Sequence, residues 1–91
     1  MRLDLFLKLS RIAPRRSVAK TLCDEGIIAV NGVVARASKE VAEGDEITVS
    51  RRDRTLVYRI NAVPAGKQVS KEQSRDLVEL ISETPMAGLI P

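Results

Sequence analysis

Six cationic side chains and a single carboxylate fall within the first 22 residues of this 91-residue chain. The carboxylate is Asp4, and the cations are Arg2, Lys8, Arg11, Arg15, Arg16 and Lys20. This stretch has a charge balance of +5, whereas residues 61–91 have a balance of −1 and the whole chain +3. Arginine side chains match phosphate oxygens in geometry, and several on one surface can follow a polyanionic backbone. The charge distribution therefore predicts a polyanion-binding face at the N-terminal end.

Asp4 stands inside this basic stretch, and its expected role is structural. It is suited to cap the first helix or to hold Arg2 or Arg16 in position. No histidine is present, and no cysteine or second carboxylate stands at a spacing that suits general acid–base catalysis. We therefore predict a binding site without catalytic residues, metal or cofactor. The alternative for the cationic stretch is a helix face that is merely solvated.

A second basic group surrounds Asp53 and consists of Arg51, Arg52, Arg54 and Arg59. One interpretation is that it extends the nucleic-acid-binding surface, with Arg51, Arg52 and Arg54 as secondary contacts. The other is that these charges protect an edge strand against aggregation. The sequence leaves both alternatives open.

Composition excludes several other classes of protein. Cys23 is the only cysteine and histidine is absent, which excludes an internal disulfide and a conventional zinc site within one chain. Cys23 is expected to be a small core residue in a cytoplasmic protein. Phe6 and Tyr58 are the only aromatic residues, which argues against RNA recognition by base stacking on a sheet. No apolar run is long enough to span a membrane, and the N-terminus lacks the pattern of a secretory signal.

Two short helices are expected to position the cations. Apolar residues recur at helical spacing from Leu3 to Ile12, which predicts a helix over about residues 3–10. A second helix has an apolar stripe at Val18, Ala19, Leu22 and Cys23. Pro14 fits the first turn of this second helix, and Gly26 fits its C-terminal cap.

A small sheet is expected to support these helices. Strands are predicted over residues 27–30, 33–35, 46–50 and 55–63. Asn31-Gly32 predicts a tight hairpin turn, because both residues tolerate positive φ. Val41 is expected to be the buried anchor of the loop before the third strand, and Ile47 and Val49 to face inward from that strand.

The C-terminal part is predicted to contain one helix. Ser70 and Gln73 form a capping-box pattern, which places a helix from there to about Ser82. Its expected packing residues are Leu77, Val78, Leu80 and Ile81. The fold class is therefore α+β, with two N-terminal helices on a small, mostly antiparallel sheet and a C-terminal helix. Residues 1–83 are expected to form one domain, and residues 84–91 a flexible tail.

Residues 1–50 resemble the S4 domain, the αL RNA-binding motif. The residues that carry the resemblance are Arg2-Leu3-Asp4, Leu7, Arg15-Arg16, Ala19, Gly26, Val30-Asn31-Gly32, Ala37-Ser38, Val41 and Gly44-Asp45. Their order and spacing make the set highly specific. Within the family, the chain is most similar to the short bacterial members of the RqcP type. It is also related to the fifteen-kilodalton heat-shock RNA-binding protein.

This resemblance implies a cytoplasmic, non-catalytic factor that binds large ribosomal subunits obstructed by peptidyl-tRNA. Such a factor contacts rRNA and tRNA, and it supports C-terminal alanine tailing by an RqcH-type factor in ribosome-associated quality control. The resemblance implies Arg2, Asp4 and Arg16 as the main contacts, surrounded by Lys8, Arg11, Arg15 and Lys20. The alternatives are a heat-shock-type recycling factor, a generic structured-RNA-binding module and a protein-interaction module. We expect a monomer without membrane association.

Overall fold

Helix α1, Leu3–Leu9, is apolar on most of its surface, and most of its side chains are buried in the interior. The structure is a computed structural model and describes residues 1–66 and 69–85. Leu3, Phe6 and Leu7 are fully buried, and such a largely apolar helix belongs in a core rather than on a surface. The helix is followed by Ser10, its C-cap, at the position where the sequence predicts its end.

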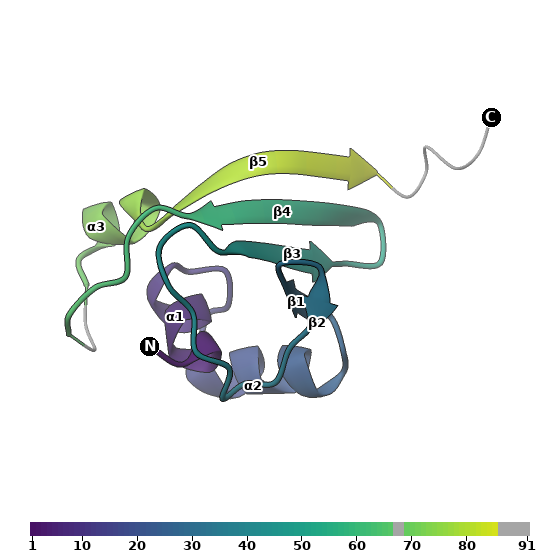
Figure 1. Cartoon of the computed structure of the whole chain (residues 1–91), viewed down its shortest axis with the longest axis horizontal. Helices are drawn as coiled ribbons and strands as arrows, with labels where there is room; N and C mark the ends of the chain where they lie inside the picture. Colours follow the sequence, from purple (N-terminus) through teal and green to yellow (C-terminus); the bar gives the residue numbers. More distant parts are fainter. Residues whose placement is uncertain (67–68, 86–91) are drawn as a thin grey trace.

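Helix α2, Arg16–Asp24, lies beside α1 and buries one narrow stripe (Figure 1). Its C-terminus is closed by Gly26, which has a φ of +75°. The N–H groups of Gly26 and Ile27 donate to the carbonyls of Cys23 and Leu22, both at 3.0 Å. This is the Schellman pattern of helix termination, and it confirms Gly26 as the cap.

The position predicted for Pro14 was wrong, because Pro14 lies before α2 and not in its first turn. Arg15 has extended dihedral angles, φ −144° and ψ 157°, so the helix begins only at Arg16. The N–H of Ala13 donates to the carbonyl of Leu7 at 3.0 Å. That bond folds the connection back onto the end of α1, so the chain is still turning at Pro14.

Five strands form one antiparallel sheet in the order β2-β1-β3-β4-β5 (Figure 1). The strands are β1 Ile28–Val30, β2 Val33–Val34, β3 Glu46–Ser50, β4 Arg54–Ile60 and β5 Val78–Pro85. Asn31 and Gly32 have φ values of +52° and +85°. These values confirm the predicted hairpin turn and, with the helices, the α+β class.

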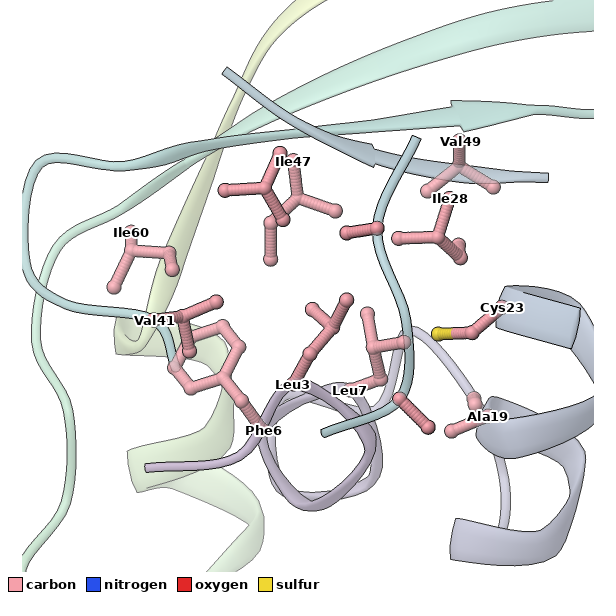
Figure 2. Close-up of a cluster of buried hydrophobic side chains, with 14 of the residues drawn as sticks. Leu3, Phe6, Leu7, Ala19, Cys23, Ile28, Val41, Ile47, Val49 and Ile60 are labelled. Atoms are coloured by element: carbon pink, nitrogen blue, oxygen red, sulfur yellow. The ribbon is translucent and has the colours of Figure 1, made fainter. Parts of the chain in front are cut away.

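The core lies between α1 and the sheet. Figure 2 shows Phe6 and Leu7 of α1 pointing toward the sheet, with Ile47 above them. The three residues predicted to face inward, Val41, Ile47 and Val49, are all buried. Since α1 packs directly on the sheet, the position of its first turn is fixed by the core.

The C-terminal helix is shorter than predicted, and a strand replaces its second half. Helix α3, Lys71–Asp76, begins with the predicted capping box between Ser70 and Gln73. The chain then forms β5, which pairs with β4 along its whole length. Leu80 and Ile81, which were expected to pack in a helix, are 49% and 37% exposed. Pairing with β4 satisfies the backbone groups that the two strands turn toward each other, and this overrides the helical spacing of the side chains.

The end of β5 extends into the segment that was expected to be a flexible tail. Thr84 and Pro85 pair with Thr55 and Arg54 of β4. The rest of that segment, residues 86–91, lies outside the described residues. Because β5 is present, β4 is an interior strand of the sheet.

We predict that Gly26→Ala lowers the free energy of unfolding by about 1 kcal/mol, because a side chain is strained at positive φ. An added Cβ would meet only Val34 Cγ1, at 4.0 Å, so the cost comes from the backbone rather than from a clash. Urea denaturation measures the change. The matched control is Gly66→Ala, where an added Cβ meets nothing within 4 Å and φ lies outside the left-handed region. Equal stability of the two variants would contradict the assignment.

Candidate nucleic-acid interface

A buried carboxylate holds two arginines at the N-terminal ends of α1 and α2. Asp4, in the first turn of α1, is only 3% exposed. Arg2 Nε and Nη2 donate to its Oδ1 and Oδ2 at 3.2 and 3.3 Å. From α2, Arg16 Nε lies 3.2 Å from Oδ2. The Leu5 N–H donates to Oδ1 at 2.8 Å, so the carboxylate has partners on both oxygens.

The pKa of Asp4 is lowered from its ordinary value. Burial on its own raises the pKa, but hydrogen bonds from Arg16, Arg2 and the Leu5 N–H lower it by more. The carboxylate is therefore ionised at neutral pH. This confirms the predicted role of Asp4 in orienting cations.

The two guanidinium groups remain accessible while Asp4 is shielded. The side chains of Arg2 and Arg16 are 47% and 45% exposed, compared with 4% for that of Asp4. Each guanidinium carries five N–H donors, more than Asp4 can accept. The arrangement therefore presents oriented cations to a ligand and keeps the anion inside, which suits binding of phosphate groups.

The other predicted cations surround this pair without joining it. Lys8 lies on α1, Arg11 and Arg15 in the connection, and Lys20 on α2; all four are exposed. Within residues 1–66 and 69–85, no ion pair occupies any of them. They are available to an external polyanion.

Arg2 also lines two hollows in the surface. One, of about 470 Å³, adjoins Arg16 and the segment 63–66. The other, of about 390 Å³, brings Arg2 and Lys20 together with Arg36 from the loop after β2. Arg36 was not among the predicted site residues, because it stands alone, well beyond the basic run. The alternation Ala35-Arg36-Ala37 is the sequence signal that could have identified an outward-facing cation, and both alanines are buried.

Half of the second basic group is engaged within the protein. Arg54 pairs with Asp53 at 3.0 Å and with Glu83 at 2.7 Å, and Arg59 lies 4.0 Å from Glu46. Edge protection was the wrong interpretation for Arg54 and Arg59, since β4 is an interior strand. The turn between β3 and β4 also lies at the far end of the sheet from α1 (Figure 1).

Arg51 and Arg52, in that turn, are exposed and make no ion pair within the described part of the chain. Their role as secondary contacts, and that of Arg54, stays a prediction.

Cys23 is a core residue, as predicted. It is 5% exposed, and burial, together with the nearby charges of Asp4 and Asp24, raises the pKa of its thiol to about 11. Among the residues that the structure describes, no group of acidic, histidine or cysteine side chains could hold a metal ion. Over the same residues, no helix has the length and apolar character needed to cross a membrane.

We predict that Asp4→Asn lowers the free energy of unfolding at pH 7 by about 1–3 kcal/mol, the usual range for breaking charged hydrogen bonds. The pKa of Asp4 is lowered in the native state. The ionised carboxylate therefore stabilises the fold fully at pH values above its ordinary pKa. The effect is lost as the pH falls through the lowered native value. Urea denaturation of both proteins from pH 7 to pH 3 should give a difference that narrows with acidity. Asp24→Asn, an exposed carboxylate in α2, is the control, and a constant difference would refute the assignment.

We predict that Arg11→Gly is more stable than Arg11→Ala by about 1 kcal/mol, because Arg11 has a φ of +65° and only glycine adopts this region without strain. The comparison at Lys8, a helical residue in the last turn of α1, should have the opposite sign, since glycine is less favourable than alanine within a helix. Thermal denaturation of the four variants tests both signs. The same sign at both positions would contradict the left-handed conformation of Arg11.

Comparison with known proteins places this site in a family. A family model described as the S4 domain matches residues 1–47. The chain is 41% identical over 87 residues to the RQC P-site tRNA stabilizing factor of Halalkalibacterium halodurans, covering 96% of this chain and 97% of that protein. It is 37% identical over 83 residues to the protein of the same name from Bacillus subtilis, covering 91% and 94%.

The fold has a counterpart among solved structures. The trimeric structure of Vibrio cholerae Heat Shock Protein 15 superposes with a TM-score of 0.78 at 26% identity, covering 90% of this chain and 82% of that one. The family model covers the helical pair and the sheet up to β3, and the relatives match nearly the whole chain. The chain therefore belongs to the S4 domain family and, within it, to the family of RQC P-site tRNA stabilizing factors.

Proposed function

We propose that this protein binds rRNA and peptidyl-tRNA on obstructed large ribosomal subunits and supports C-terminal alanine tailing in ribosome-associated quality control. The observation that carries the proposal is the buried Asp4, which orients the exposed Arg2 and Arg16. This site lies in a chain that is 41% identical to a P-site tRNA stabilizing factor over nearly its full length. As a member of that family, the protein is a non-catalytic RNA-binding factor.

The proposed binding mechanism depends on fixed phosphate contacts. Arg2 and Arg16 donate charge-assisted hydrogen bonds to backbone phosphates, and Lys8, Arg11, Arg15 and Lys20 surround them. Folded RNA presents its backbone and 2′-hydroxyl groups more readily than its base edges, so recognition is by shape. Binding releases counterions, and affinity falls steeply with salt.

The partners follow from the same proposal. The protein acts as a cytoplasmic monomer on the large subunit, where an RqcH-type factor extends the stalled chain. A second candidate is recycling of stalled subunits, favoured by the structural similarity to Heat Shock Protein 15 at a TM-score of 0.78. The higher identity of the tRNA-stabilizing relatives, 41% against 26%, favours the tailing role.

We predict that Arg16→Ala removes the protein from large subunits that carry peptidyl-tRNA and leaves the fold intact. Sucrose-gradient sedimentation of cell extracts with the tagged protein measures this. Arg75→Ala is the matched control, because it removes an exposed arginine from the last turn of α3, outside the candidate site. Arg16→Ala should stay folded, because Asp4 retains Arg2 and the Leu5 N–H as partners. Circular dichroism checks that both variants are folded.

Three outcomes would contradict the proposal in whole or in part. If the wild-type protein stays at the top of the gradient, the remaining interpretation is a protein-interaction module unrelated to ribosomes. Alternatively, Arg16→Ala could sediment like Arg75→Ala, which would remove Arg16 from the interface. Binding without alanine tails in cells that contain an RqcH-type factor would favour the recycling candidate.

A further inference from the structure

The hollow between α2 and the loop after β2 has the composition of an anion site. Its volume is about 390 Å³, and its lining consists of Arg2, Lys20, Cys23, Asp24, Arg36, Ala37 and Ser38. Three of these side chains are cationic and one is a carboxylate, so the lining has a net charge of +2. The hydroxyl of Ser38 adds a neutral hydrogen-bond donor.

Backbone contacts hold the loop that carries Arg36 against α1. Neither helix of the pair has a side-chain cap at its N-terminus. In α1 the N–H groups of Leu3 and Asp4 instead donate to the carbonyls of Lys39 and Ala37, at 2.8 and 3.1 Å. The loop therefore replaces the missing cap. The place of Arg36 relative to Arg2 is set by hydrogen-bonded backbone rather than by a freely moving loop.

The side chain of Arg36 is directed outward by its neighbours. Ala35 and Ala37 are 9% and 6% exposed, whereas Arg36 is exposed. Among the residues that the structure describes, neither Arg36 nor Lys20 has an ion-pair partner. Two cations that face one hollow without an ion-pair partner within the described residues are suited to an external anion.

We propose that this hollow binds one backbone phosphate of the RNA, held by Lys20 and Arg36 together. The inference rests on the proposed function, and it extends the interface from the helical pair to the loop after β2. Arg2 lines both this hollow and the one beside Arg16, so the hollow adjoins the Arg2–Asp4–Arg16 cluster. A water molecule takes about 30 Å³ of liquid volume, and 390 Å³ therefore accommodates a phosphate with its sugar. Asp24, on the same lining, opposes an anion, and the three cations outweigh it.

The test uses full-length protein and purified large-subunit rRNA, with filter binding over a range of salt concentrations. Each phosphate contact contributes about one to the slope of log affinity against log salt. Arg36→Ala and Lys20→Ala should each reduce that slope by about one. The double variant should reduce it by about the same amount, because both cations hold a single phosphate. Arg36→Lys should keep the wild-type slope, and Arg75→Ala is the control for an arginine outside the site.

Several results would overturn the inference. If Arg36→Ala and Lys20→Ala bind like Arg75→Ala, no phosphate occupies the hollow. If the losses of slope add up in the double variant, the two cations contact separate phosphates, and the shared site is wrong. In both cases Arg16→Ala should still weaken binding, so the proposed function survives. If the wild-type protein shows no salt-dependent binding to the rRNA, the proposed function and the inference are both wrong.

Discussion

The ion pairs of Asp4 with Arg2 and Arg16 are the interaction on which the binding face depends. Two guanidinium groups would repel each other if they had no counterion between them. A carboxylate that is 3% exposed keeps them at fixed positions and presents little of its own negative charge to a ligand. The lowered pKa of Asp4 is a consequence of these ion pairs, since they stabilise the ionised carboxylate more in the folded protein than water does.

This arrangement requires that three segments meet at the first turn of α1. Arg2 precedes the helix, Arg16 begins α2, and the loop after β2 supplies carbonyl groups to the helix N-terminus. The sheet makes this meeting possible, because Leu3 and Phe6 anchor the same turn in the core. Packing of α1 is thus both a contribution to stability and the reason why the cations have defined positions.

Local turn and cap chemistry was predictable from the sequence, and long-range pairing was not. Gly26 ends a helix because of its own conformational freedom, and Asp4 stands alone among six cations, so both were identified correctly. Pro14 was misplaced because proline is compatible both with the first turn of a helix and with a turn that precedes the helix. Leu80 has helical spacing from its neighbours, but pairing with β4 decides its structure. Arg36 joins the basic face only through the fold, which no charge run along the chain can indicate.

The modest charge of the protein has a consequence for selectivity. The net charge is +3 and the N-terminal balance is +5, so the positive charge that attracts a polyanion is concentrated at the N-terminal end. Nonspecific attraction to RNA scales with the number of phosphate contacts and weakens as the salt concentration rises. Preference for one RNA surface must then come from the geometry of cations that cannot rearrange. The buried carboxylate supplies that geometry, and a flexible basic tail of equal charge would bind many RNAs almost alike.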